Sequence, residues 1–243
     1  MCVALMSKVR WGSECLDDNT SGGLSSGGIT LVYGEPETGK STLAMQCGLN
    51  CARQKLKVLF VDCDGSFSAN RLMQLAGREF EALSEFFLLV RPKDFAEQAA
   101  FVDRLADYVE KNFGLIVFDT FTSLYRLRVA EASGKAFALN RELNRQMAVL
   151  AQAAKVTKLP LLVLSQVSSL LSETTVSVAP VATRVLKFWA DTIIAMKPTD
   201  VPQVINAVVE KSSLVKPSED ESELVCCYLR IDGSGIKDYP FHD

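Results

Sequence analysis

One stretch of the chain, residues 34–42, has the residue types and spacing of a phosphate-binding loop. Gly34-Glu-Pro-Glu-Thr-Gly39-Lys40-Ser41 matches GxxxxGK[ST], a pattern whose glycines let main-chain N–H groups turn toward phosphate oxygens. Lys40 would contact the β- and γ-phosphates, and the Ser41 hydroxyl would ligate Mg²⁺. The sequence therefore predicts that ATP with Mg²⁺ binds at Gly34, Glu35, Pro36, Glu37, Thr38, Gly39, Lys40, Ser41 and Thr42.

Acidic residues end two apolar runs that are typical of buried strands. Asp119 follows Leu115–Phe118, while Asp62 and Asp64 come at the end of the run that starts at Lys57. A carboxylate at the tip of a central parallel strand lies where open α/β sheets bind ligands, so Asp119 could hold Mg²⁺ or, alternatively, cap the next helix. Either Asp62 or Asp64 could orient an attacking water, and both could instead form a turn.

An amide ends a further apolar run. Gln166 follows Pro160–Ser165, at the edge of the sheet where the phosphate loop is expected. Its side chain could contact a γ-phosphate and transmit the loss of that phosphate to residues 167–180.

Basic residues gather between positions 126 and 145, with only Glu131 and Glu142 as acidic neighbours. The segment Val129–Ala138 is rich in small residues, which predicts a mobile loop beside a basic helix face. Such a surface could bind the phosphate backbone of DNA, or it could be an ordinary solvated face. The candidate DNA-binding residues are Arg126, Arg128, Lys135, Arg141 and Arg145.

The elements that must position these residues follow from apolar periodicity. Strands are expected at 29–33, 57–62, 86–90, 115–119 and 160–165, with helices at 40–54, 69–76, 95–111 and 137–156. Apolar strands that alternate with helices indicate a mostly parallel sheet with helices on both faces. Later strands at 191–196, 203–210 and 223–231 predict an antiparallel C-terminal extension. We expect one α/β domain over residues 1–243, with a lead-in over 1–14.

Composition narrows the classes of function. The 243 residues carry a net charge of −3, so any nucleic-acid binding must use a local patch. No apolar run reaches the roughly 18 residues of a membrane span, and we expect a soluble, cytoplasmic protein. The single histidine, His242, argues against histidine catalysis. The seven cysteines are expected to be buried thiols in a reducing compartment; Cys47 and Cys51 as half of a zinc site is the alternative.

Taken together, these residues resemble the RecA/Rad51 superfamily, and within it the archaeal RadB proteins. The segments that carry the resemblance run nearly end to end, from Cys15-Leu-Asp17 through the phosphate loop to Val209-Glu-Lys-Ser-Ser213. The resemblance implies a RecA-like ATPase core without a separate N-terminal DNA-binding domain. It also implies roles for single residues: Lys40, Asp64 and Gln166 in catalysis, Arg71 in stacking on adenine, Ser41 and Asp119 at the metal, and Lys211 near a nucleotide-capping loop.

The chain departs from the full recombinases in ways that bear on activity. Those enzymes carry glutamate where Asp64 stands, and the shorter side chain predicts slow hydrolysis. We find no Phe-x-x-Ala polymerisation element. The segment Val167–Pro180, which matches a DNA-gripping loop, contains no lysine or arginine.

Three functions are consistent with these features. The first is a DNA-binding accessory protein of recombination, whose resemblance implies a RadA-type recombinase, a Holliday-junction resolvase and further copies of itself as partners. The second is a KaiC-like signalling ATPase with no DNA role, which the acidic balance favours. The third, an active strand-exchange enzyme, is disfavoured by the missing polymerisation element and the uncharged loop.

Overall fold

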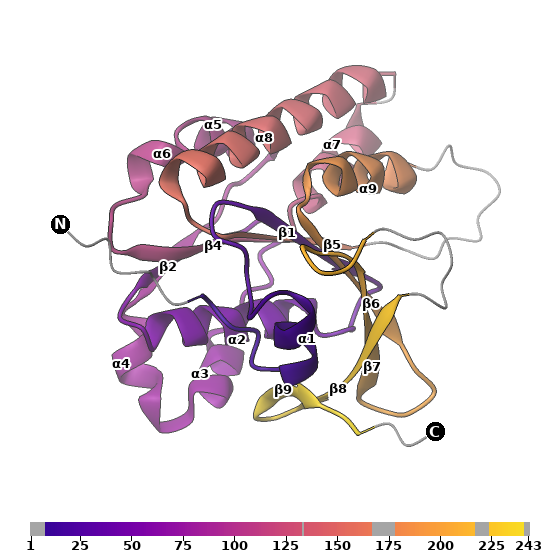
Figure 1. The fold of residues 1–243 in the computed structure, drawn as a ribbon. Coiled ribbons are helices and arrows are strands. Elements are labelled where there is room, and N and C mark those ends of the chain that lie inside the picture. Colours follow the sequence, from indigo (N-terminus) through magenta and orange to yellow (C-terminus); the bar gives the residue numbers. More distant parts are fainter. Residues whose placement is uncertain (1–7, 133, 167–177, 217–223, 241–243) are drawn as a thin grey trace.

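The computed structural model describes residues 8–132, 134–166, 178–216 and 224–240. In this part of the chain, helices cover both faces of a nine-stranded sheet whose order is β3-β2-β4-β5-β1-β6-β7-β8-β9 (Figure 1). The strands are β1 Ile29–Gly34, β2 Lys57–Asp62, β3 Phe87–Val90, β4 Phe113–Asp119, β5 Leu161–Gln166, β6 Thr192–Pro198, β7 Val204–Lys211, β8 Val225–Asp232 and β9 Gly235–Asp238.

The sheet changes direction after β6. Strands β1 to β6 pair in parallel, whereas β7, β8 and β9 pair in antiparallel fashion. The central strands are buried on both faces, which explains their continuous apolar runs. The predicted α/β class, with a mostly parallel sheet and an antiparallel C-terminal extension, is confirmed.

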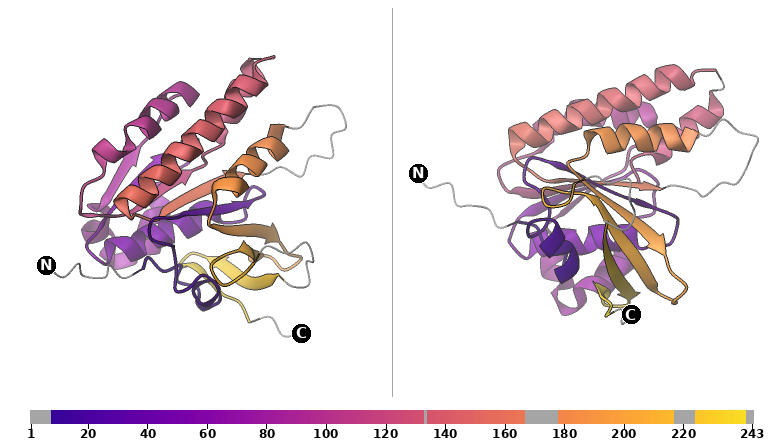
Figure 2. Two further views of the ribbon diagram at one scale, coloured as in Figure 1. Left: turned by 45° about the horizontal axis from the view of Figure 1, so that its top comes forward. Right: turned by 45° about the vertical axis from the view of Figure 1, so that its right-hand side comes forward.

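Two hydrophobic cores lie on opposite faces of the sheet. Alternate residues of β1, β2, β4, β5 and β6 contribute to one core or the other, as Val117 and Phe118 do on β4. The views in Figure 2 show the long helices together on one side and α2 with the C-terminal strands on the other. The helices are α1 Glu14–Asn19, α2 Lys40–Ala52, α3 Ala69–Ala76, α4 Phe80–Ser84, α5 Phe95–Asp103, α6 Leu105–Tyr108, α7 Ser123–Glu131, α8 Ala136–Thr157 and α9 Val178–Trp189.

Two sequence predictions about helices need correction. The helix expected at 95–111 is two helices, because Arg104 leaves helical geometry (φ −104°, ψ 9°) and its N–H bonds Phe101 three residues back. It ends at Tyr108, since Val109 is extended and leads into β4. The loop expected over 129–138 is largely helical, because α7 continues to Glu131 and α8 begins at Ala136.

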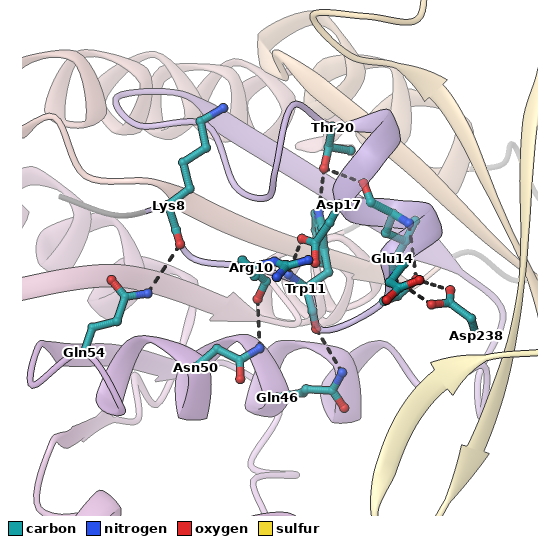
Figure 3. A network of polar contacts seen from close by, with 12 residues as sticks. Lys8, Arg10, Trp11, Glu14, Asp17, Thr20, Gln46, Asn50, Gln54 and Asp238 are labelled. Atoms are coloured by element: carbon teal, nitrogen blue, oxygen red, sulfur yellow. Dashed lines mark hydrogen bonds and ion pairs between the residues drawn. The ribbon is translucent and has the colours of Figure 1, made fainter. Parts of the chain in front are cut away.

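The described part of the lead-in, residues 8–14, runs along the outer side of α2. Three amides at helical spacing hold it: Gln46, Asn50 and Gln54 donate to the carbonyls of Trp11 (2.9 Å), Arg10 (3.0 Å) and Lys8 (3.3 Å) (Figure 3). The Trp11 ring is fully buried beneath this segment. The lead-in is therefore part of the packed structure.

The prediction that the cysteines are all thiols is wrong at two positions. Cys15 and Cys227, far apart in the sequence, form a disulfide with 5.7 Å between Cα atoms. Cys47 and Cys51 are buried free thiols on α2, and burial raises the pKa of Cys51 to about 12. A zinc ligand must be a thiolate, so burial disfavours the zinc alternative at this pair.

Within the described ranges, no helix combines the length and apolar character that crossing a membrane would require.

Candidate phosphate-binding site

The predicted phosphate loop connects the end of β1 to the start of α2. Gly39 is the N-cap of α2 with φ +83°, in the left-handed region that favours glycine. As a glycine it brings no side chain to cap the first N–H groups of α2, so these donors are available to an anion. A Cβ atom here would lie 2.5 Å from Cδ1 of Ile231, and one at Gly34 would lie 2.2 Å from the Met196 carbonyl oxygen. Both glycines are required sterically.

Lys40, the lysine of the loop, has a buried side chain. Its Nζ donates to the carbonyl of Glu35 and to Oγ1 of Thr38 (3.1 Å), both within the loop. Burial lowers the pKa of Lys40 to about 8, and the negative charges of Asp119 and Glu35 oppose this shift. The ammonium group is thus held where an additional negative charge would stabilise it.

Asp119 ends β4 and is 1% exposed. Its carboxylate accepts a hydrogen bond from the Thr120 hydroxyl (3.1 Å), and the nearby Ser41 hydroxyl lowers its pKa. The other carboxylate oxygen, Oδ2, is buried without a hydrogen-bond partner among the described residues. Burial raises the pKa of Asp119 to about 6, with Asp64 and Asp62 adding to the shift. The Asp119–Thr120 peptide bond is cis.

These features fit a phosphate group and a divalent cation. The Asp119 carboxylate, which has one unpartnered oxygen, and the Ser41 hydroxyl interact, and hard oxygen ligands of this kind suit Mg²⁺. The buried Lys40 ammonium and the free amides at the start of α2 suit phosphate oxygens. The protein itself compensates the buried charges of Lys40 and Asp119 only partly. A bound phosphate and a divalent cation would compensate the remainder.

The structure distinguishes the two aspartates that follow β2. The Asp62 carboxylate is buried. It accepts hydrogen bonds from Nε of Arg91 (2.7 Å) and from the main-chain N–H of Ser66 (3.0 Å). Asp64 is exposed and accepts from the Thr120 hydroxyl (3.2 Å), which also bonds Asp119. Asp64 therefore faces the candidate metal position, and Asp62 anchors the turn. Sequence reasoning missed Thr120, whose only signal is its place directly after Asp119.

Gln166 and Arg71 reach the site from other elements. Gln166 pairs in register with Gly34, so the end of β5 lies directly beside the start of the loop. The Arg71 guanidinium donates to the carbonyls of Asp232 (2.8 Å) and Gly233 (3.4 Å) in the β8–β9 turn. The same hairpin supplies Ile231 against Gly39. Arg71 and the loop therefore contact one hairpin.

A second group that sequence reasoning missed joins distant elements near the loop. Nζ of Lys187 bonds the Tyr33 hydroxyl and Glu210, both at 2.7 Å, and the Tyr33 hydroxyl also donates to Glu210 (2.5 Å). Burial and the Glu210 carboxylate raise the pKa of Tyr33. Only tertiary structure brings α9, β1 and β7 together here. Lys211, at the end of β7, instead donates to the Ala190 carbonyl (2.6 Å).

The basic residues of α7 and α8 are partly neutralised. Arg145 pairs with Asp103 (2.5 Å) and Glu142 (2.7 Å), and Arg128 pairs with Glu131 (3.2 Å). Arg126 is half-buried, while Lys135 and Arg141 are exposed. The predicted DNA-binding residues thus share one side of the molecule, but two of them already have acidic partners. Most of the segment 167–180 lies outside the described residues.

A phosphate loop between β1 and α2, flanked by β5 and facing a carboxylate on β4, defines a RecA-like P-loop fold. The Rad51 family profile matches residues 4–239. The chain therefore belongs to the Rad51 family, on its RadB branch.

Individual relatives agree with this assignment. The chain is 35% identical to the DNA repair and recombination protein RadB of Thermococcus kodakarensis over 231 residues, 93% of this chain and 97% of that protein. It is 28% identical to the RadB protein of Methanococcus maripaludis, over 84% and 92% of the two chains. A crystal structure of a RadB recombinase superposes with a TM-score of 0.74 at 32% identity, and covers 96% of this chain and 100% of the other.

Proposed function

We propose that this protein binds ATP with Mg²⁺ at residues 34–42 and acts as an accessory protein in DNA repair and homologous recombination. The observation that carries the proposal is the convergence of Lys40, Ser41 and the buried, incompletely bonded Asp119 at the end of the loop. The repair and recombination role rests on the names of the RadB relatives.

The residues have distinct tasks in this proposal. Main-chain amides from Gly34 to Thr42 and the Lys40 ammonium bind the phosphates, while Ser41 and Asp119 hold the cation. Bound Mg²⁺ would neutralise phosphate charge. Asp64 positions the attacking water, Gln166 senses the γ-phosphate, and Arg71 stacks on the adenine. Because the Asp64 side chain is short, ATP acts more by occupancy than by turnover.

The proposal includes contacts outside the nucleotide site. Exposed Lys135 and Arg141, with Arg126, Arg128 and Arg145, contribute to DNA binding from α7 and α8. A RadA-type recombinase is the expected protein partner, with a Holliday-junction resolvase and further copies of this chain as additional ones. All of these activities belong to a single core domain in the cytoplasm.

Substitution of Lys40 tests the nucleotide site. Lys40→Ala is expected to abolish measurable ATP binding, because even one charge-assisted hydrogen bond is worth roughly tenfold to hundredfold in affinity. Isothermal titration with a non-hydrolysable ATP analogue and Mg²⁺ measures the change. Lys55→Ala, which removes a lysine just beyond the other end of α2, is the matched control. Normal affinity in Lys40→Ala would show that the nucleotide assignment is wrong.

A KaiC-like signalling ATPase without a DNA role is the second candidate. The ion pairs of Arg128 and Arg145, together with the net charge of −3, favour it. DNA binding measured at two salt concentrations separates the candidates. Affinity that falls steeply as salt rises supports the recombination role, whereas no binding at low salt supports signalling.

A further inference from the structure

A row of cavities lies along the edge of the sheet opposite the phosphate loop, where the parallel strands begin. The first, of about 270 Å³, lies between the ends of α8 and α9 and is lined by Lys155, Phe188, Trp189 and Lys211. The last, of about 500 Å³, lies beside the end of α2 and is lined by Lys8, Arg10 and Arg53. A narrow space of about 40 Å³ between them is lined by Lys8, Ser26 and Lys158.

A shared residue and neighbouring residues place these cavities next to one another. Lys8 lines both the large and the narrow one, and Figure 3 shows its side chain extending away from α2. Ser26 lines the narrow space, and its neighbour Gly27 lines the first cavity and lies against Lys158. We call this path from Phe188 through Lys158 and Lys8 to Arg53 the amino-edge groove.

The groove carries positive charge that the protein does not neutralise. Lys8 and Lys211 donate only to main-chain carbonyls, of Ser21 and Ala190 (both 2.6 Å). Along the described chain, neither these two lysines nor Lys155 and Lys158 form ion pairs, unlike Arg128 and Arg145 on α7 and α8. Arg10 and Arg53 pair with Asp17 and Glu79. Asp191 and Glu14 are the other acidic groups in the walls, and Asp191 accepts from the Ile29 N–H.

An aromatic platform stands at one end of the groove. Phe188 is 75% exposed, although a side chain of this size normally packs inside. It meets Trp189 edge to face at 5.3 Å between ring centroids, and Nε1 of Trp189 is fixed by Asn144 (2.9 Å). Because three quarters of the Phe188 side chain is exposed, the ring is accessible to a stacking partner. The lysines at the end of α8 also interact favourably with the helix dipole. The dipole does not explain Lys8 and Lys211, which lie outside α8, and it does not explain the exposed ring of Phe188.

We propose that the amino-edge groove binds single-stranded DNA, with Phe188 stacking on a base and Lys155, Lys158 and Lys8 contacting phosphates. Unpaired lysines beside an open aromatic face are the two features that non-specific single-strand binding sites combine. The inference rests on the proposed DNA role and places the contact on the side of the sheet remote from the nucleotide. Double-stranded DNA does not fit the same mode, because its bases are already stacked.

Fluorescence anisotropy with a labelled oligothymidine tests the groove. Phe188→Ala is expected to weaken binding roughly five- to hundredfold, the range for loss of one base–aromatic stack. The double variant Lys155→Ala/Lys158→Ala is expected to reduce the slope of log affinity against log salt by about 1.4, or about 0.7 per lost phosphate contact. Both changes are on exposed side chains, and thermal melts verify that each variant is folded.

Matched controls separate the groove from the α7–α8 surface. Phe137→Ala removes a phenylalanine that is even more exposed, at the far end of α8, and Lys93→Ala removes a lysine beyond the other edge of the sheet. Neither is expected to change affinity. Equal weakening of duplex binding by Phe188→Ala would overturn the stacking proposal.

The remaining outcomes distinguish the two proposals. If the groove variants bind single-stranded DNA like the wild type while Arg126→Ala/Arg141→Ala loses affinity, the proposal that the groove binds DNA is wrong. The proposed DNA role of the protein then stands. If the wild type binds no single-stranded DNA at low salt, the groove and the DNA role both fail.

Discussion

At the scale of single residues, the site is built from charges that the fold destabilises. Burial lowers the pKa of Lys40 to about 8 and raises that of Asp119 to about 6, so both groups are displaced toward their neutral forms. Their mutual attraction offsets only part of the desolvation. Such a site favours a ligand that brings both signs of charge, as a triphosphate with a divalent cation does.

Asp119→Asn should therefore stabilise the ligand-free protein. The folded-state pKa of Asp119 is raised from 3.8 to about 6, so the native state binds this proton more tightly than the unfolded chain, and stability falls as pH rises between those values. Asn is expected to raise the free energy of unfolding by about 1–3 kcal/mol at neutral pH. Urea unfolding measures this. The gain should shrink as the pH is lowered through 6, and a loss of stability at neutral pH would contradict the argument.

Asp64→Glu tests how the short carboxylate limits turnover. The Asp64 side chain is exposed and bonds only Thr120 and the local turn, so a longer side chain can extend toward the site without disturbing the core. Steady-state phosphate release is expected to rise by up to about tenfold, because small errors in placement cost large factors in rate. Asp64→Asn, which removes the charge at equal size, should lower the rate. An unchanged or slower Asp64→Glu variant would mean that Asp64 does not position the water.

At the scale of elements, α2 is held on two sides by segments that are remote in the sequence. The lead-in lies along it through the amide ladder, and the β8–β9 hairpin packs against its N-cap residue, Gly39. Gln46 connects the two: its side chain bonds the Trp11 carbonyl and both main-chain groups of Ile236 (2.8 and 3.0 Å). The helix that carries Lys40 is thus positioned by both ends of the chain.

Gln46→Ala is expected to lower the free energy of unfolding by about 2–4 kcal/mol, since it leaves several main-chain groups without a partner. Asn50→Ala, one turn along the same ladder, removes a single bond that is exposed to solvent and should cost about 0.5–1 kcal/mol. Chemical denaturation of both variants measures the difference. Equal losses would show that the connection between the lead-in and the hairpin contributes nothing beyond a single surface bond.

At the scale of the whole molecule, the two edges of the sheet have opposite electrostatic character. Asp62, Asp64 and Asp119 lie at the edge where the parallel strands end, whereas unpaired lysines line the edge where they begin. Helix direction contributes to this polarity, because the helices between parallel strands begin at the first edge and end at the second. A net charge of −3 therefore conceals a basic surface.

The Cys15–Cys227 disulfide joins α1 to β8 across 212 residues of sequence. Reduction, or Cys15→Ser, is expected to lower the free energy of unfolding by roughly 3–5 kcal/mol, because the unbridged unfolded chain gains entropy. Urea unfolding with and without dithiothreitol measures this change. Cys226→Ser alters the exposed neighbour outside the bridge and should have no such effect. A wild-type midpoint that does not respond to reductant would contradict the expectation.

The sequence by itself determined the phosphate loop, the parallel strands and the position of Asp119 at a strand tip. Each of these depends on residues close together in the chain: a fixed glycine–lysine spacing, or an apolar run ended by a carboxylate. Helix α3 begins and ends where its local pattern predicts. The break at Arg104 has no comparable local signal, which is why the sequence predicted one continuous helix there. The small residues of 129–138 did indicate a connection, but they could not show that α7 continues to Glu131 and that α8 begins at Ala136.

Tertiary structure alone decided which groups face each other. Four contacts join residues whose sequence positions hold no information about one another: the Cys15–Cys227 disulfide, the Arg91–Asp62 ion pair, the Arg145–Asp103 ion pair, and the cavity that brings Lys155 and Lys211 to Phe188. Periodicity predicts that a side chain lies on a surface, but the charge that opposes it comes from another element. For this reason the proposed nucleotide site could be predicted from the sequence, and the proposed amino-edge groove could not.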